Sequence, residues 1–257
     1  MVASTIVFVH GMFMTPLCWE GWTARFTALG YRCLAPAWPG RERSVAELNA
    51  AHPDPALGRL TLTDVVDSMV RVLASLDDKP IVVGHSMGGL VTQILVNRDL
   101  AAAGVALHPA PPAGVFALSW PLLRCNWPMI SPFVDRWAPR AMSFEDFQYA
   151  FVNTLPLAAQ KAAYDRYVVP ESRMVPRDSL GAIGRVDFRK PHAPLLITAG
   201  EKDHIVPAVL NRANVAKYRR AGSGADFGEF PGRDHFGLGA PGWEEIADFV
   251  AARLPKA

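Results

Sequence analysis

The stretch Gly84-His85-Ser86-Met87-Gly88 constrains this chain more than any other feature of its sequence. It follows the apolar run Ile81-Val82-Val83, which is typical of a buried strand, and it leads directly into a segment with helical periodicity. A turn this sharp forces its central residue into strained backbone geometry, and Gly84 and Gly88 relieve the crowding. With 20 glycines in the chain, the pattern alone also fits an ordinary glycine-rich turn. Its position between a strand and a helix instead predicts that Ser86 is raised at a helix N-terminus, where developing negative charge is favoured.

Short runs rich in β-branched and aromatic residues predict further strands that are covered on both faces. These runs are Thr5–Val9, Arg32–Ala35, Val105–Leu107, Leu195–Thr198 and, more weakly, Asp226–Phe230. Residues spaced as on one face of a helix occur between them, most clearly over Leu62–Leu76 and from Trp243 to Leu254. Strands alternating with helices predict an α/β fold with a mainly parallel sheet of about six strands, flanked by helices.

One long segment, from Pro111 to Asp187, has no comparable strand signal but has helical stretches at Phe144–Asn153 and Leu157–Tyr167. It carries nine aromatic residues that we single out: Phe116, Trp120, Trp127, Phe133, Trp137, Phe144, Phe147, Tyr149 and Phe151. We predict a helical cap over residues 111–187, inserted into a core formed by residues 1–110 and 188–257. Such a cap would cover the carboxyl ends of the strands, where open α/β sheets place their sites. We expect most of these aromatic residues only to pack the cap onto the core, and about a third to line a pocket.

Composition and charge exclude several classes of function. Half of the 257 residues are hydrophobic, 19% are charged and the formal net charge is only +2. Arg41-Glu42-Arg43 and Arg219-Arg220 are too short for a basic patch, and we interpret them as solvated loops. We therefore expect neither a nucleic acid nor a membrane among the partners.

Cysteine usage and the first residues indicate the compartment. Cys18, Cys33 and Cys125 are scattered and odd in number, which suits free thiols in a reducing environment. The chain begins without a basic leader and has no apolar run long enough to span a bilayer. We predict a cytoplasmic protein, a monomer or a small homo-oligomer. The histidines are dispersed, so we expect no metal and no cofactor.

A second motif, His10-Gly11-Met12-Phe13, closes the first predicted strand. If Ser86 is a nucleophile in acyl transfer, the reaction develops an oxyanion that preorganised backbone N–H groups stabilise. We predict that these groups are the amides of Met87, directly after the serine, and of Met12. His10 and Gly11 would then shape the loop that carries Met12.

The order of these motifs resembles the α/β-hydrolase superfamily, and the resemblance covers essentially the whole chain. In chain order, these motifs are a strand with a His-Gly loop, the G-H-S-M-G-G elbow, an insertion, a strand ending in Gly-x-x-Asp and a late histidine. The resemblance implies that Asp203, after the strand at Leu195–Thr198, is the catalytic acid, with Glu201 as its nearest rival. Some relatives carry the acid one strand earlier, but His108-Pro109-Ala110 offers no carboxylate there.

The resemblance also makes His235, in the loop Gly232-Arg233-Asp234-His235-Phe236, the general base. In such a triad the histidine takes the serine proton, and the aspartate fixes the imidazole tautomer and stabilises its positive charge. We interpret Asp234 as a surface or loop-shaping residue and His85 as structural.

The implied function is a serine hydrolase that cleaves a carboxylic ester, a lactone or a thioester of a small to medium apolar substrate through an acyl-enzyme on Ser86. Serine at the elbow argues against epoxide hydrolases and haloalkane dehalogenases, which use aspartate there. Phe236 stands where hydroxynitrile lyases of this fold carry lysine. The alternatives are a cofactor-free haloperoxidase or perhydrolase, a C–C bond hydrolase and a non-catalytic ligand-binding protein.

Overall fold

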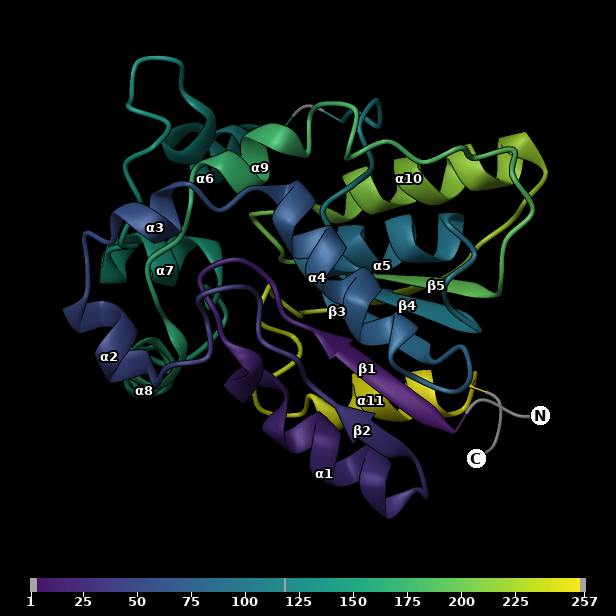
Figure 1. The fold of residues 1–257 in the computed structure, drawn as a ribbon. Coiled ribbons are helices and arrows are strands. Elements are labelled where there is room, and N and C mark those ends of the chain that lie inside the picture. The colour runs from purple at the N-terminus through teal and green to yellow at the C-terminus, as the bar shows by residue number, and fades with distance from the viewer. Residues whose placement is uncertain (1–3, 118, 255–257) are drawn as a thin grey trace.

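A parallel sheet of six strands forms the centre of the structure, a computed structural model that describes residues 4–117 and 119–254 (Figure 1). The strand order is β2-β1-β3-β4-β5-β6, and every neighbouring pair is parallel. The strands are β1 (Thr5–Val9), β2 (Arg32–Leu34), β3 (Ile81–His85), β4 (Ala103–Leu107), β5 (Leu195–Gly200) and β6 (Asp226–Phe230). The predicted fold class and strand number are confirmed.

Both faces of the sheet are buried, which explains the continuous apolar runs in the sequence. Along β1, Ile6 and Phe8 belong to one core cluster, and Val7 and Val9 belong to another on the opposite face. All four side chains are fully buried. Each strand therefore supplies apolar side chains to two layers of helices.

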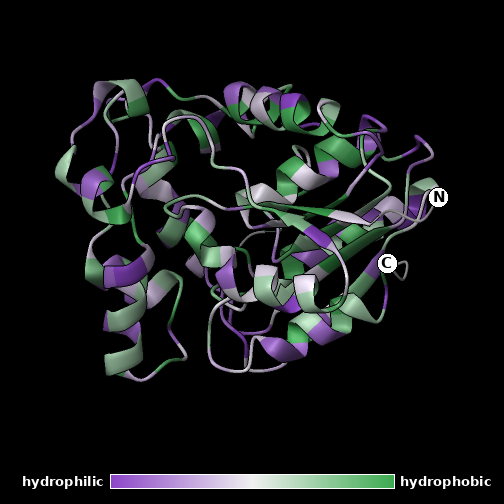
Figure 2. Cartoon of the chain, turned by 60° about the horizontal axis from the view of Figure 1, so that its bottom comes forward, coloured by the Kyte–Doolittle hydropathy of each residue, from purple (hydrophilic) through white to green (hydrophobic). Residues whose placement is uncertain are grey.

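Helices cover each face of the sheet (Figure 1). On one face lie α4 (Leu62–Ala74), α5 (Met87–Asn97) and α10 (Ala208–Ala221), and on the other lie α1 (Glu20–Ala28) and α11 (Glu244–Ala251). Figure 2 shows the central strands coloured mostly as hydrophobic, whereas the helices around them carry both kinds of residue. This pattern is that of amphipathic helices packed on an apolar sheet.

Helix α4 begins and packs as its sequence predicts. The Thr61 side chain accepts a hydrogen bond from the Asp64 amide, and the Asp64 carboxylate accepts one from the Thr61 amide, which forms a capping box. The buried residues of the helix recur at the spacing of one helical face: Leu62, Val65, Val66, Met69 and Leu73.

A cluster of aromatic side chains fixes α1 to the sheet and to the chain that follows β6. The fully buried Trp22 ring stacks on Phe26 and lies edge-on to Phe8. Its indole N–H donates a 2.9 Å hydrogen bond to the carbonyl oxygen of Leu238. Because Leu238 lies three positions after His235, this bond helps to fix the loop that carries this histidine.

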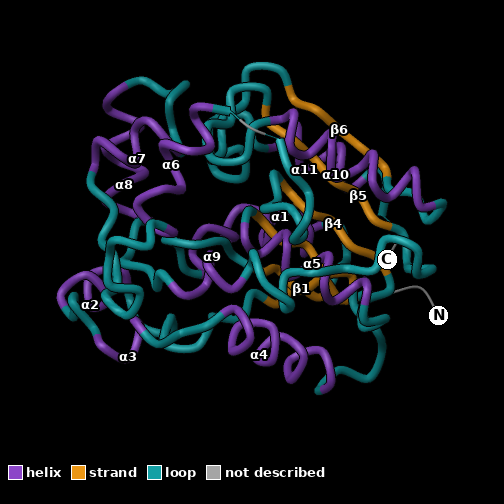
Figure 3. The backbone as a smooth tube through the Cα atoms, turned by 90° about the horizontal axis from the view of Figure 1, so that it is seen from above, coloured by secondary structure: helices purple, strands orange, loops and turns teal. Residues whose placement is uncertain are grey.

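The segment between β4 and β5 is helical, and Figures 1 and 3 show it grouped beyond the carboxyl ends of the strands. Its helices are α6 (Trp120–Ile130), α7 (Phe144–Ala150), α8 (Leu157–Tyr167) and α9 (Met174–Asp178). The predicted helix at Leu157–Tyr167 is confirmed, and the one predicted from Phe144 ends at Ala150. Pro121 and Pro128 hid α6 from sequence analysis, although a proline is tolerated in the first turn.

Shorter helical elements complete the chain before β3. They are η1 (Pro16–Trp19), a 3₁₀ helix, followed by α2 (Val45–Ala50) and α3 (Pro55–Gly58). In the described part of the chain, no helix has the length and apolar character needed to cross a bilayer.

Candidate active site

The turn from β3 to α5 holds Ser86 in a strained conformation, with φ 56° and ψ −119°. Its amide donates to the carbonyl oxygen of Leu107 at 3.0 Å, and its carbonyl oxygen accepts from the amide of Ala110 at 2.9 Å. A Cβ on Gly84 would lie 2.1 Å from the Gly88 carbonyl oxygen, and one on Gly88 would lie 2.2 Å from a carbonyl oxygen of β1. The elbow thus requires both glycines.

The structure brings Ser86, His235 and Asp203 into one hydrogen-bonded chain. The Ser86 hydroxyl lies 2.9 Å from Nε2 of His235, and Nδ1 of His235 lies 2.7 Å from Oδ2 of Asp203. The other carboxylate oxygen, Oδ1, accepts from the amides of Ile205 and Val206, both at 2.8 Å. Because a carboxylate can only accept, Nδ1 carries the proton and Nε2 is left to accept from the serine hydroxyl.

Two further acidic residues, Glu201 and Asp234, lie near Asp203 in the sequence but bind other partners. Glu201 is exposed, and its carboxylate accepts from the Gly232 amide at 2.8 Å. Asp234 is buried and accepts from the hydroxyl of Thr154 at 2.6 Å and from the amide of Phe236 at 3.2 Å. The sequence left two interpretations of Asp234 open, a surface residue or a loop-shaping residue. Its burial shows that the first is wrong, and its contacts agree with the second. Burial raises the pKa of the Asp234 carboxyl.

Two buried histidines surround His235. Nε2 of His85 donates to the carbonyl oxygen of His235 at 2.8 Å, the contact of a structural residue. His108, directly after β4, places Nδ1 4.0 Å from Oδ2 of Asp203. Burial lowers the pKa of His85 well below its usual value and that of His108 to about 4. The sequence prediction for His108-Pro109-Ala110 concerned only the missing carboxylate. His108 lies near Asp203 because β4 lies between β3 and β5 in the sheet.

His10 organises the loop after β1. Its Nδ1 donates to the carbonyl oxygen of Gly11 at 2.8 Å, and its Nε2 accepts from the amide of Trp38 at 3.2 Å. The imidazole also stacks on the Trp38 ring, with 4.5 Å between centroids. Burial lowers the pKa of His10 to about 3, so the ring is neutral at pH 7.

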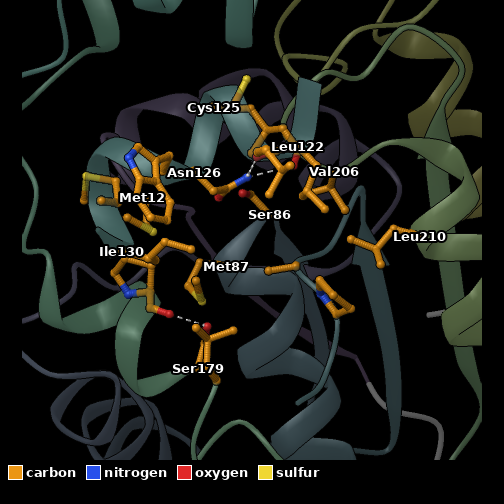
Figure 4. Close-up of a pocket in the computed structure, with 18 of the residues that line it drawn as sticks. Met12, Ser86, Met87, Leu122, Cys125, Asn126, Ile130, Ser179, Val206 and Leu210 are labelled. Carbon is orange, nitrogen blue, oxygen red and sulfur yellow. Dashed lines mark hydrogen bonds between the residues drawn. The ribbon is translucent and has the colours of Figure 1, made fainter. Parts of the chain in front are cut away.

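Two backbone amides near Ser86 have no acceptor within residues 4–117 and 119–254. They belong to Met12 and Met87, the pair that the sequence predicts as oxyanion donors. Both residues line the same cavity as Ser86 (Figure 4). The next residue after Met12, Phe13, has a left-handed backbone with φ 62°, so the loop is strained at this point.

The carboxylate of Glu171 holds this strained loop in place from within the helical segment. It accepts from the amide of Phe13 at 3.0 Å and from that of Ser172 at 2.7 Å. The Arg41 guanidinium lies 2.8 Å from it, and both side chains are fully buried. The Arg41 nitrogens have no hydrogen-bond acceptor in the described structure. The attraction is therefore mainly coulombic.

The interpretation of Arg41-Glu42-Arg43 as a solvated loop is wrong for Arg41, which is 1% exposed. A run of neighbouring residues carries no information on a partner such as Glu171, which lies far along the chain.

A cavity of about 560 Å³ opens beside Ser86, mostly between the helical segment and the sheet. Figure 4 shows side chains of α6 on one side of it and the start of α5 on another. Its walls are almost wholly apolar, and they include Met12, Met87, Leu122, Ile130, Val206 and Leu210. The site can therefore hold an apolar group against the serine hydroxyl.

The aromatic residues of the helical segment divide differently from the expectation. Phe116, Trp127 and Phe151 line the cavity, which is the predicted third of the nine. The other six were expected to pack the cap onto the core. Three of them have exposed side chains, Trp120, Phe133 and Trp137, and the expectation is wrong for these three. Periodicity could not distinguish these positions because irregular chain surrounds α6.

The described residues contain no group of three or more His, Cys, Asp or Glu side chains placed to hold a metal ion. The hydrogen-bonded series Ser86, His235 and Asp203 can move a proton between serine and histidine.

Comparison with known proteins identifies the family and the fold. The model of the alpha/beta hydrolase family matches residues 6–251. No curated protein matches the chain. Among solved structures, a pyrethroid hydrolase from Sphingobium faniae JZ-2 is similar with a TM-score of 0.68 at 18% identity, over 98% of this chain and 97% of that one. A methylesterase from Arabidopsis has a TM-score of 0.69 at 16% identity, over 96% of this chain and 98% of that one. A monoacylglycerol lipase from Paleococcus ferrophilus has a TM-score of 0.68 at 18% identity, over 98% of this chain and 94% of that one.

The buried histidines predict that acid destabilises the fold. His10, His85 and His108 all have pKa values below that of an unfolded histidine, so the unfolded chain binds more protons as the pH falls below 6.5. We expect each histidine to lower the free energy of unfolding by about 1.4 kcal/mol per pH unit between pH 6.5 and its folded pKa, about 4 for His108. Urea unfolding at several pH values measures this slope. His108→Gln should reduce it, and an unchanged slope would contradict the assignment.

The ion pair generates a second prediction. Glu171→Ala leaves the buried Arg41 charge unpaired and should cost about 3–5 kcal/mol of unfolding free energy at pH 7. The double variant Arg41→Met/Glu171→Gln removes both charges but keeps an oxygen for the Phe13 amide. It should unfold within about 1 kcal/mol of wild type in urea, since replacing a whole buried pair is often neutral. Equal losses in the two variants would show that charge is not the cause.

Proposed function

The chain belongs to the alpha/beta hydrolase family, and from this premise we propose that it is a serine hydrolase that cleaves carboxylic esters of small to medium apolar compounds. One observation carries the proposal. The Ser86 hydroxyl is bonded to Nε2 of a histidine whose Nδ1 is bonded to Asp203, and this hydroxyl faces an apolar cavity beside two amides without acceptors. The methylesterase and the monoacylglycerol lipase among the similar structures agree with it.

In the first half of the reaction, Ser86 Oγ attacks the ester carbonyl carbon while Nε2 of His235 takes the hydroxyl proton. The carbonyl oxygen becomes an oxyanion, which the amides of Met12 and Met87 stabilise. Asp203 keeps the proton on Nδ1 and stabilises the imidazolium. When the C–O bond breaks, the alcohol leaves with the proton from Nε2, and an acyl group stays on Ser86.

In the second half, water replaces the alcohol. His235 takes a proton from the water, whose oxygen attacks the acyl carbon and forms a second oxyanion in the same position. Collapse of this intermediate returns the proton to Ser86 Oγ and releases the acid.

The helical segment at residues 111–187 serves as a cap in this proposal, over a core of residues 1–110 and 188–257. Its residues form much of the cavity wall, and none of the residues that line the cavity has a charged side chain. An apolar acyl or alcohol group would be desolvated there, while the ester group stays beside Ser86.

A fluorophosphonate probe tests the nucleophile, because it reacts with activated serines. We expect the probe to label the wild type and Ser86→Ala to abolish both labelling and ester hydrolysis. Ser179→Ala is a matched control, since Ser179 lines the same cavity without a histidine partner among the described residues. Labelling or hydrolysis that survives in Ser86→Ala contradicts the proposal.

The acid is tested by a pair of neutral substitutions. Asp203→Asn should lower kcat by about 10⁴-fold, because an amide donates to Nδ1 and forces the wrong imidazole tautomer. Glu201→Gln should leave kcat nearly unchanged, since Glu201 is exposed and bound to Gly232. The reverse outcome would make Glu201 the acid.

The cavity predicts how activity varies with substrate size. For 4-nitrophenyl esters of straight-chain acids, each added methylene should raise kcat/KM by about fourfold, the equivalent of about 0.8 kcal/mol. The increase should stop once the acyl chain fills a cavity of about 560 Å³, and longer chains should react more slowly. Steady-state kinetics from acetate upward measure this profile. A steady decline from acetate would mean that the cavity does not bind the acyl group.

A further inference from the structure

The cavity beside Ser86 has few polar groups, and most of them are already engaged. Side-chain nitrogen or oxygen atoms among its lining residues belong to Ser86, Asn126, Trp127 and Ser179. The Ser86 hydroxyl bonds to the histidine, and the Ser179 hydroxyl donates to the carbonyl oxygen of Pro176 at 2.7 Å. The indole of Trp127 can only donate. Asn126 is the remaining lining residue with a polar side chain, and its amide offers both a donor and an acceptor.

The amide of Asn126 is fixed in one orientation by two carbonyl groups. Its Nδ2 donates to the carbonyl oxygen of Leu122 at 2.9 Å and to that of Ile205 at 3.2 Å. Both hydrogens of the NH₂ group are used, and only this flip of the amide can satisfy two acceptors. Oδ1 consequently turns away from them, and no residue in the described ranges donates to it.

Figure 4 shows this amide near the Ser86 hydroxyl, with its nitrogen turned toward the two carbonyl oxygens. Ser179 lies on the opposite side of the pocket in the same view. Asn126 Oδ1 is thus an acceptor without a donor among the described residues, held in a fixed orientation in the cavity that Ser86 also lines. Asn126 is only partly buried, so Oδ1 is open to the cavity in the free protein. An apolar substrate that covers this oxygen removes its contact with water, and a substrate that donates a hydrogen bond to it avoids that cost.

We infer that Asn126 Oδ1 accepts a hydrogen bond from the substrate, and that the preferred substrates are apolar esters with a hydroxyl or N–H group close to the ester. This inference rests on the proposed function and makes Asn126 a specificity-determining residue. The two bonds from Nδ2 pre-orient the acceptor, so little side-chain entropy is lost on binding.

Two matched pairs of esters test the inference on the acyl side and on the alcohol side. Ethyl mandelate differs from ethyl phenylacetate by one hydroxyl, and 2-hydroxyethyl phenylacetate compares with propyl phenylacetate. Within each pair, the ratio of kcat/KM values is measured for the wild type, Asn126→Leu and Asn126→Ser. In at least one pair, we expect both variants to lower the hydroxyl-to-deoxy ratio by about 3- to 10-fold, the effect of one neutral hydrogen bond.

The ratio separates recognition from structure. Loss of the bonds to Leu122 and Ile205 would disturb α6 and slow both esters of a pair equally, which leaves the ratio unchanged. Leu123→Ala, a lining residue of the same helix, is the control and should change both esters by one factor. Unchanged ratios in both pairs overturn the inference while Ser86-dependent hydrolysis continues. If ethyl phenylacetate hydrolysis does not depend on Ser86, the proposed function itself fails.

Discussion

The Glu171 carboxylate is the contact on which the geometry of the site depends. It lies in the helical segment between β4 and β5, yet it accepts from the amide of Phe13 in the loop after β1 and pairs with Arg41. One buried group therefore fixes the cavity wall, the strained loop and the adjacent amide of Met12 relative to one another. Burial of such a pair adds little net stability, because desolvation of both charges offsets their attraction. Its effect is on position: a loop with φ 62° at Phe13 stays in place only if its surroundings hold it there.

A second constraint comes from the register of the sheet. Ser86 is held by the amide and carbonyl groups of the chain that continues β4, through Leu107 and Ala110. The carbonyl oxygens of β1 leave no room for a side chain at Gly88. Since parallel strands bring their carboxyl ends to the same edge, Ser86, His108 and Asp203 follow neighbouring strands β3, β4 and β5. The strain at the serine is thus stored in a rigid frame. The histidine loop is anchored to its surroundings by the bonds of Asp234 to Thr154, of His85 to the His235 carbonyl oxygen and of Trp22 to Leu238.

Local patterns predicted those parts of the molecule that local physics determines. The strands and α4 follow from periodicity, and the elbow follows from glycines at positions where a Cβ would clash. The resemblance to the α/β-hydrolase superfamily led to the prediction of Asp203 and His235, which share a hydrogen bond in the structure. Contacts between distant residues were missed, because no spacing records them. The sequence predicted a solvated Arg41, but this residue is buried beside Glu171. A surface position was one of two alternatives for Asp234, which is buried and bound to Thr154. No sequence pattern pointed to Asn126, because its proposed role depends on the orientation of its side-chain amide.

Burial of the histidines around His235 has an electrostatic consequence for the proposed reaction. His85 and His108 are neutral at pH 7 because the interior disfavours their charged forms. When His235 takes the serine proton, neither neighbour repels the imidazolium, and Asp203 is the charged group bonded to it. A protonated His108, with Nδ1 4.0 Å from Asp203, would instead compete for the carboxylate and oppose proton transfer. The burial that makes the fold sensitive to acid therefore also keeps a second charged imidazole away from the oxygen of Asp203 that binds His235.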